Sequence, residues 1–140
     1  MRIGIIGHGN MGRALTKLFN RNGFVNFTIS DVDTKKTHFS NARNIAASDI
    51  LFLCVKSEDI PNVLSDFSIS QQKIVISMAS TPISKFPSHL KVIRMVPNLS
   101  IQYGVGIIPY YSQYVEVPSE IRKHCKGLEL IKCAEEKLLD

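Results

Sequence analysis

The sequence has few cysteines, no long hydrophobic run and no cluster of basic residues. Its three cysteines, Cys54, Cys125 and Cys133, are too few and too scattered for a disulfide framework, and without a CxxC pair they predict no metal ribbon. The longest apolar run, ILFLCV, is far shorter than the roughly 20 residues that a membrane helix needs. The chain opens on a strand-like run with glycines after it, not on a secretory signal. We therefore expect a cytoplasmic protein with reduced thiols and no membrane partner.

The positive charge of the chain is spread along the sequence. The formal net charge is +5, but pairs such as Lys35 and Lys36 are isolated rather than part of a basic stretch. Nucleic-acid-binding proteins usually concentrate this charge on one face, so we expect no nucleic-acid partner. A modest positive field would suit an anionic cofactor.

Apolar runs and helical periodicities alternate along the chain. Between the runs, apolar residues recur every three or four positions from Met11 to Asn22, from Glu58 to Phe67 and, more weakly, from Ser119 to Cys125. Gly23 follows the first of these as a candidate left-handed cap. The alternation predicts an α/β fold with a mostly parallel sheet, and ILFLCV, apolar on both faces, predicts a central strand covered by helices on each side. The strand-like runs are Arg2–Ile6, Phe27–Ser30, Ile50–Val55, Lys73–Ser77, Val92–Val96, Val105–Tyr110 and Leu128–Cys133.

A glycine pattern follows the first strand-like run and opens the first helical one. In a dinucleotide-binding turn, Gly7 would make the tight turn, Gly9 would let the backbone approach the pyrophosphate, and Gly12 would let the helix pack closely on the sheet. The phosphates would then lie against unpaired amide groups at the helix N-terminus. This context predicts a Rossmann-like open sheet with helices on both faces.

The residues after the second strand-like run leave the choice of dinucleotide open. Asp31 stands where an acidic residue would accept hydrogen bonds from the adenosine ribose, which favours NAD. Lys35 and Lys36 could instead meet a 2′-phosphate, which favours NADP. Asp31 could also be a simple turn aspartate. We assign no proton chemistry to His8 in the glycine loop.

Four segments, in order, carry a resemblance to a known family. They are IGIIGHGNMGRAL, SDILFLCVK, VIRMVPN and GVGI, and with them the chain resembles the N-terminal domain of pyrroline-5-carboxylate reductase from Met1 to Asp140. The resemblance implies that the loop from Gly7 to Gly12, with His8, Asn10 and Met11 inside it, holds the pyrophosphate of NADP or NAD.

The resemblance also implies where the rest of the cofactor lies, since ligands of open parallel sheets cross the carboxyl ends of the strands. It assigns no catalytic side chain and no metal ligand within this sequence. The further implied positions are Asn41 at the adenosine end, Cys54, Val55 and Lys56 along the cofactor, Met78, Ala79 and Ser80 near the nicotinamide ribose, and Pro97 and Asn98 where substrate approaches.

The sequence departs from the family pattern in four places. Ser57 replaces a proline and is expected to cap the helix that begins at Glu58. The nicotinamide loop lacks its usual glycine. The segment between Asp31 and Asp49 includes NARNIAA, which predicts a short helix. The residues that remain are too few for a full helix-containing crossover between two strands. We therefore expect the second helix of the fold to be missing and Phe39 to begin only a stub of a third strand. Finally, members of the family continue into a second, all-helical domain that begins with an SGSGPAY-like segment, and no segment of this sequence matches it.

These features define the expected function. The resemblance implies an NAD(P)H-dependent oxidoreductase that transfers a hydride to the cyclic imine 1-pyrroline-5-carboxylate in proline biosynthesis. We expect one dinucleotide-binding domain, residues 1–140, without the helical domain that dimerises and completes the substrate pocket, and hence poor activity of the chain alone. A homodimer is possible. The alternatives are a non-enzymatic nucleotide-sensing or partner-binding module on the same fold and another reductase of the hydroxyacid or F420-linked group.

Overall fold

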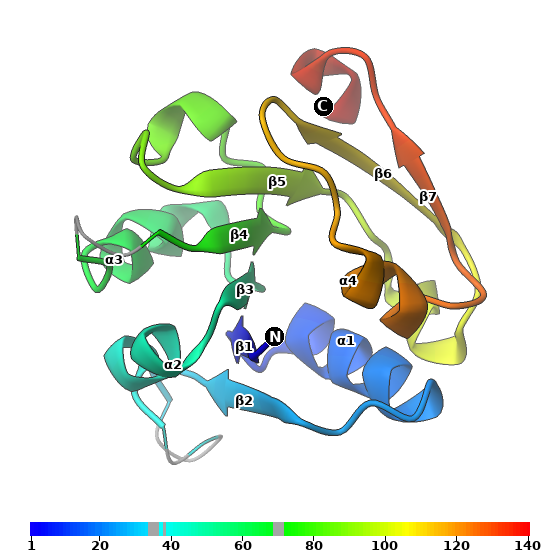
Figure 1. Ribbon diagram of the computed structural model, residues 1–140, viewed down its shortest axis with the longest axis horizontal. Coiled ribbons are helices and arrows are strands. Elements are labelled where there is room, and N and C mark those ends of the chain that lie inside the picture. Colours follow the sequence, from blue (N-terminus) through cyan, green and yellow to red (C-terminus); the bar gives the residue numbers. More distant parts are fainter. Residues whose placement is uncertain (34–36, 38, 69–71) are drawn as a thin grey trace.

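A computed structural model describes residues 1–33, 37, 39–68 and 72–140. The described residues form one twisted sheet of seven strands in the order β2-β1-β3-β4-β5-β6-β7 (Figure 1). All neighbouring strands pair in parallel except β5 and β6, which are antiparallel. The strands are β1 (Ile3–Ile6), β2 (Phe27–Ser30), β3 (Ile50–Leu53), β4 (Ile74–Ser77), β5 (Lys91–Met95), β6 (Ile107–Ser112) and β7 (Glu129–Lys132).

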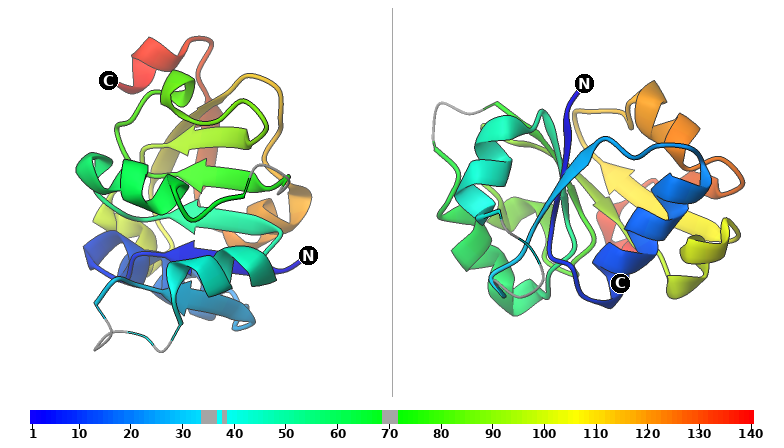
Figure 2. Two further views of the ribbon diagram at one scale, coloured as in Figure 1. Left: turned by 90° about the vertical axis from the view of Figure 1, so that its left-hand side faces the viewer. Right: turned by 90° about the horizontal axis from the view of Figure 1, so that it is seen from below.

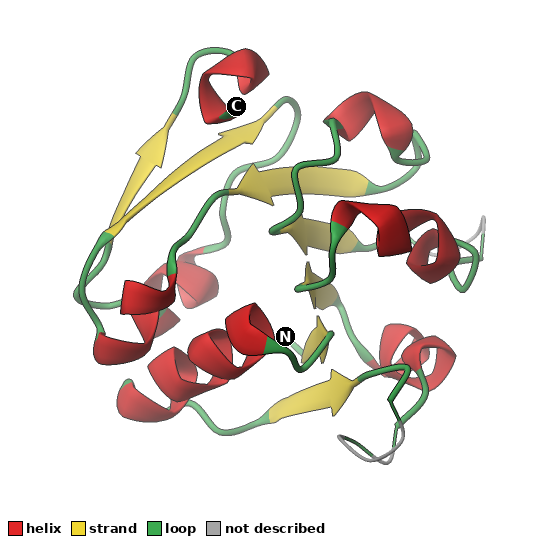
Figure 3. Ribbon diagram, turned by 180° about the vertical axis from the view of Figure 1, so that it is seen from behind, coloured by secondary structure: helices red, strands yellow, loops and turns green. Residues whose placement is uncertain are grey.

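Helices cover both faces of this sheet. Seen from below, α1 and α4 lie on one side and α2 and α3 on the other (Figure 2), and the view from behind shows the same two layers (Figure 3). Short 3₁₀ helices join several strands to the next element. The α-helices are α1 (Asn10–Arg21), α2 (Asn41–Ala47), α3 (Ile60–Leu64) and α4 (Ser119–His124), and the 3₁₀ helices are η1 (Ser57–Asp59), η2 (Ile83–Lys85), η3 (Leu99–Tyr103) and η4 (Glu136–Leu139).

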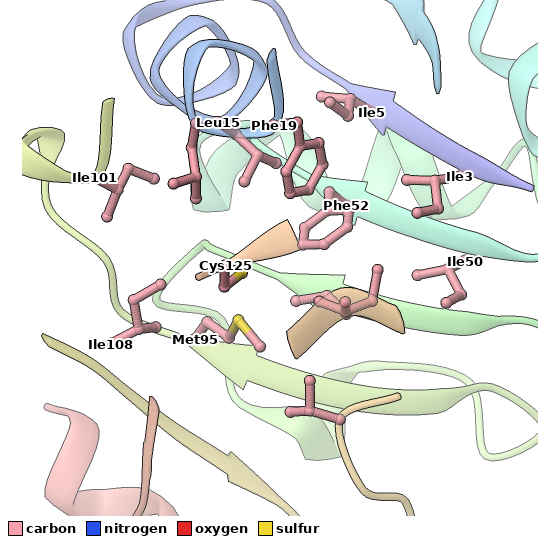
Figure 4. Packing of buried hydrophobic residues seen from close by; sticks show 14 of the residues in the cluster. Ile3, Ile5, Leu15, Phe19, Ile50, Phe52, Met95, Ile101, Ile108 and Cys125 are labelled. Carbon is pink, nitrogen blue, oxygen red and sulfur yellow. The ribbon is translucent and has the colours of Figure 1, made fainter. Parts of the chain in front are cut away.

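Strand alternation builds a separate core on each face. On the α1 side, Ile5 and Phe52 pack with Phe19 of α1, and Figure 4 shows these side chains pointing toward one another. On the opposite face, Leu51 and Leu53 of β3 pack with α2 and α3. β3 is therefore buried on both faces, and this confirms the prediction from ILFLCV that it is a central strand.

The expected elements are present, with local corrections. Gly23 has φ +80° and follows α1 as the predicted left-handed residue. The helix predicted from Glu58 to Phe67 is shorter, because η1 precedes α3 and the chain turns after Leu64. There the Ser65 hydroxyl donates to the carbonyl of Asn62 at 2.6 Å, a local bond that competes with helix continuation.

The segment after β2 confirms the shortened crossover. The predicted stub of a third strand is reduced to a single parallel bridge between Ser30 and Phe39. Among the described residues, α2 is the first helix after β2, so the usual second helix is missing from them.

The described residues contain neither a membrane-spanning helix nor a cluster of metal-ligating side chains. None of their helices is long and apolar enough to cross a membrane. In the same part of the chain, no group of three or more histidine, cysteine, aspartate or glutamate side chains could hold a metal ion.

Candidate functional site at the carboxyl ends of the strands

The glycine loop joins β1 to α1 in a conformation that requires glycine. Gly7 has φ +97°, and its amide donates to the carbonyl of Ser30 at 2.8 Å. A Cβ added at Gly12 would lie 2.0 Å from the carbonyl oxygen of Gly7, so the loop and α1 touch through their backbones. At Gly9, by contrast, an added Cβ would meet no atom within 4 Å. Gly7 and Gly12 therefore have structural reasons to be glycine, whereas Gly9 borders open space.

The N-terminus of α1 faces that open space. Gly9 is the N-cap and, having no side chain, makes no side-chain capping bond, while its carbonyl accepts the first helical bond from the amide of Arg13 at 3.0 Å. The first amides of an α-helix have no acceptor within the helix. The N-terminus of α1 can therefore present amide donors, from Asn10 and Met11, to an anion.

Arg13 adds a positive charge beside this loop. Its guanidinium donates to the carbonyl of His8 at 3.3 Å and to the side chain of Asn10 at 2.9 Å. Sequence reasoning missed Arg13, although its position directly after Gly12 places it in the first turn of the helix that follows the glycine loop. The loop thus combines a helix N-terminus with an exposed cation.

Asp31 is tied to the glycine loop from the end of β2. One carboxylate oxygen accepts from the backbone amide of His8 at 2.7 Å, and the other accepts from the amide of Asp33 at 2.9 Å. The second bond is the turn expected of an aspartate here. Asp31 therefore has a fixed carboxylate beside the loop as well as a turn-forming role. Lys35, the competing candidate, lies outside the described residues.

Two adjacent pockets open beside Asp31. The inner pocket, of about 240 Å³, is lined by Ile6, Gly7, Asp31, Val32, Asn41, Val55, Asp59, Asn62, Val63 and Asp66. The outer pocket, of about 600 Å³, is lined by Asp31, Val32, Thr37, Phe39, Ser40, Asn41, Ala42 and Asp66. Asp31, Val32, Asn41 and Asp66 line both pockets. The arrangement offers an apolar slot with a polar rim, suited to a flat heterocycle and its attached sugar.

A buried polar network holds Asn41 in place. The Ser30 hydroxyl donates to the Asn41 side-chain oxygen at 2.9 Å and accepts from the amide nitrogen of fully buried Asn44 at 3.0 Å. Asn44 also donates to the Ile5 carbonyl at 2.9 Å and accepts from the Ser48 hydroxyl at 3.0 Å. Sequence reasoning placed α2 correctly but missed Asn44, because a buried asparagine looks like a surface one until its partners are known.

The segments after β3 and β4 touch one another. The Cys54 sulfur lies 3.7 Å from that of Met78, and burial of the Cys54 thiol raises its pKa to about 12. This thiol is therefore an apolar packing group at neutral pH rather than a nucleophile. Val55 lines the inner pocket, and Lys56 is the exposed residue that precedes η1.

Ser57 acts differently from the capping role expected of it. Its hydroxyl lies 2.7 Å from the Ser80 hydroxyl and accepts from the Ser80 backbone amide at 3.1 Å. The predicted cap is wrong because η1 already includes Ser57, and its side chain instead joins the loop after β3 to the loop Met78–Ser80. Ala79 in that loop is buried.

Pro97 and Asn98 follow β5 at the same edge of the sheet. The Asn98 side chain accepts from the backbone amide of Ser100 at 2.9 Å and so caps η3. η3 in turn packs against α1. Among the predicted residues, Gly7, Asp31, Asn41 and Val55 line the inner pocket. The loop after β4 contacts the loop after β3 through Ser80 and Ser57, and Pro97 and Asn98 follow β5 at the same edge of the sheet.

Positive and negative groups lie in different places along the carboxyl ends of the strands. The N-terminus of α1 and Arg13 make one part positive, whereas Asp31, Asp59 and Asp66 place three carboxylates around the inner pocket. Sequence reasoning singled out only Asp31 among these three. Asp59 and Asp66 come from η1 and from the turn after α3, and only the folded chain brings them to the same pocket as Asp31.

The described site therefore has three chemical parts: amide donors at a helix N-terminus, an apolar slot beside a fixed carboxylate, and a shallow row of loops running away from it. A diphosphate, an adenosine and a second nucleoside are the groups that these parts would match in turn.

Comparisons with known proteins agree with this geometry. A family model described as "NADP oxidoreductase coenzyme F420-dependent" matches residues 2–81, more than half of the chain. Pyrroline-5-carboxylate reductase of Aquifex aeolicus is 32% identical over 123 residues, covering 77% of this chain and 46% of the relative. The reductase of the same name from Methanosarcina acetivorans is 34% identical over 132 residues, covering 77% of this chain and 49% of the relative. The chain thus spans about half the length of these curated relatives.

Solved structures show the same fold. The pyrroline-5-carboxylate reductase of Coxiella burnetii superposes with a TM-score of 0.83 and 18% identity, over 99% of this chain and 60% of that one. The Plasmodium falciparum pyrroline carboxylate reductase, solved with NADP bound, gives a TM-score of 0.76 and 22% identity, over 94% of this chain and 58% of that one. The resemblance noted in the sequence is confirmed: the chain belongs to the family of NADP oxidoreductases described as coenzyme F420-dependent, and the curated relatives that it resembles are pyrroline-5-carboxylate reductases.

Proposed function

We propose that this chain is the dinucleotide-binding part of a pyrroline-5-carboxylate reductase-like oxidoreductase. The observation that carries the proposal is the cradle at Gly9, where the first amides of α1 face open space and an added Cβ would meet nothing within 4 Å. NADP or NAD fits these residues: the diphosphate would lie against the amides of Asn10 and Met11, and the adenosine would enter the inner pocket beside Asp31 and Asn41.

The remaining residues would position the other half of the cofactor. Cys54 and Met78 offer a closely packed apolar surface, while the bond between Ser57 and Ser80 fixes two neighbouring loops relative to each other. The bound dinucleotide would supply the hydride, and the substrate would be a small cyclic imine approaching near Pro97 and Asn98. The contribution of this chain is to fix distance and orientation, since holding reactants in place lowers the barrier without any catalytic side chain.

The direct test is titration of the purified chain and of Gly9→Ala with NADH and NADPH. The wild type should bind at least one of them saturably. Gly9→Ala should fold normally, because its Cβ enters open space, but should bind at least about tenfold more weakly, because that space is where the diphosphate would lie. Asn20→Ala, on the exposed surface of α1, serves as the matched control. Failure of both dinucleotides to bind at millimolar concentration would contradict the proposal.

A binding-only module on the same fold is the second candidate. A fold does not by itself fix a function, so dinucleotide binding alone does not decide between the two candidates. An assay with NADPH or NADH and 1-pyrroline-5-carboxylate at high protein concentration separates the two. Slow but saturable oxidation of the cofactor supports a reductase domain, whereas dinucleotide binding with no turnover supports the module. Solution molar mass would show whether the chain forms a homodimer.

A further inference from the structure

We infer that Arg94 and Glu136 are positioning residues for the nicotinamide half of the dinucleotide, because together they fix the loop after β4 on which that half would lie. The inference rests on the proposed function and deepens it. Sequence reasoning singled out neither residue, since one lies within a strand and the other in a segment distant from the glycine loop.

The order of the strands indicates where the nicotinamide half would lie. The diphosphate would lie at the N-terminus of α1, which follows β1, and the adenosine would enter the inner pocket, whose lining includes residues after β2. The next strands in the sheet are β3 and β4. Because ligands of open parallel sheets cross the carboxyl ends of the strands, the second nucleoside would meet the loop Met78–Ser80 after β4.

Arg94 is an almost completely buried cation beside this loop. Its two neighbours along β5 pack in the core on the α1 side, so strand alternation directs Arg94 to the opposite face of the sheet. There its Nε donates to the carbonyl of Ala79 at 3.4 Å. Its Nη atoms pair with the carboxylates of Glu136 at 3.3 Å and Asp140 at 2.6 Å. One planar guanidinium therefore connects the loop after β4 to η4 and the residue after it.

Glu136 connects this cation to the other end of the same loop. Its Oε1 accepts from the backbone amide of Ile83 at 2.7 Å and from Nη1 of Arg94 at 3.3 Å. The loop is thus held at Ala79 by the guanidinium and at Ile83 by the carboxylate. The bonds to Ser57 hold its middle. The backbone after β4 therefore has fixed attachments to β5, to η1 and to η4.

This support should act on one half of the cofactor only. A loop that is ordered before the ligand binds loses little conformational freedom on binding, so more of its contact energy appears as affinity. Without Glu136 the amide of Ile83 loses its acceptor, and Arg94 keeps only the exposed carboxylate of Asp140. Neither Arg94 nor Glu136 lines the inner pocket or belongs to the glycine loop, so the adenosine and the diphosphate should keep their contacts.

Calorimetric titration of the full chain with NADH and with ADP tests the inference, since ADP has the adenosine and the diphosphate but no nicotinamide riboside. Glu136→Ala should weaken NADH binding by about three- to tenfold and leave ADP binding within about twofold of the wild type. Arg94→Lys keeps the charge but loses the planar fork, and it should show the same selective loss. The matched control is Glu135→Ala, at the exposed neighbour that pairs with Lys137 at 3.1 Å, and it should change neither affinity.

The outcomes separate this inference from the proposed function. Equal weakening of NADH and ADP would make the pair a general stabiliser of the fold and overturn the inference, as would an unchanged NADH affinity in either variant. If Glu136→Ala does not fold, Glu136→Gln, which keeps an oxygen acceptor for the amide of Ile83, provides the same test with an expected selective loss of about two- to threefold. If the wild type binds neither ADP nor NADH, the proposed function itself fails.

Discussion

Replacing Gly12 with alanine tests how the glycine loop is built. Gly12 lies in the first turn of α1, and the new Cβ would lie 2.0 Å from the carbonyl oxygen and 3.0 Å from the carbonyl carbon of Gly7. Even the short carbon–oxygen contacts of folded proteins are about 3.3 Å. The overlap exceeds one ångström and involves backbone on both sides, so no side-chain rotation can relieve it.

Neither partner is free to move. α1 is held by Leu15, Leu18 and Phe19, whose side chains are 1%, 0% and 0% exposed. Gly7 is held by its bond to Ser30 and by φ +97°. Overpacking of this kind costs about 3 kcal/mol, and the higher helix propensity of alanine offsets at most about 1 kcal/mol. We therefore expect a net loss of about 2–3 kcal/mol in the free energy of unfolding, or roughly 6–12 °C in Tm.

Urea denaturation followed by circular dichroism measures this loss, with Gly9→Ala as the matched control. At Gly9 the added methyl group meets nothing within 4 Å, so its stability should change by less than about 1 kcal/mol. A tight backbone contact at Gly12 is contradicted if Gly12→Ala unfolds at the wild-type urea concentration, or if Gly9→Ala loses as much stability as Gly12→Ala.

Three further predictions concern His124, Arg94 and Cys54. Burial lowers the pKa of His124, so the unfolded chain binds a proton at this imidazole more readily than the folded chain does. The free energy of unfolding should therefore be highest above about pH 6.5 and should fall as the pH drops below that value. Urea titrations at several pH values should show a flatter pH dependence for His124→Phe. Arg94, 1% exposed, pairs with Glu136 at 3.3 Å, and Arg94→Met should cost about 1–3 kcal/mol and speed amide exchange in η4; unchanged exchange there would count against the pairing. Because burial raises the pKa of Cys54 to about 12, iodoacetamide at mildly alkaline pH should label Cys133 well before Cys54, as peptide mass spectrometry would show.

The sequence predicted most of the architecture because much of it follows from local patterns. ILFLCV is apolar at consecutive positions, and this alone places β3 between two helix layers. NARNIAA formed α2 with the predicted bounds, Asn41–Ala47, since Ser40 before it accepts from the amide of Arg43 and caps the helix. Elements defined by their own residues were thus predictable.

The parts of the candidate site that depend on distant partners were not predictable. The hydroxyl of Ser57 was expected to cap a helix, but Ser80, which follows the next strand, competes for it. Asn44 gave no signal, although its burial against Gly4 of β1 leaves no room there for a side chain. Asp66 is an ordinary surface aspartate in the sequence, and only the folded chain brings it to the same pocket as Asp31.

The central claim is that the N-terminus of α1 binds the diphosphate of a dinucleotide. Amide NMR spectra of the isotopically labelled chain, recorded during titration with NADH, test it residue by residue. We expect the largest shifts at the amides of Gly9, Asn10 and Met11, with a second group at Asp31 and Val32. Saturable binding that leaves these amides unmoved and shifts a different face of the sheet would contradict it.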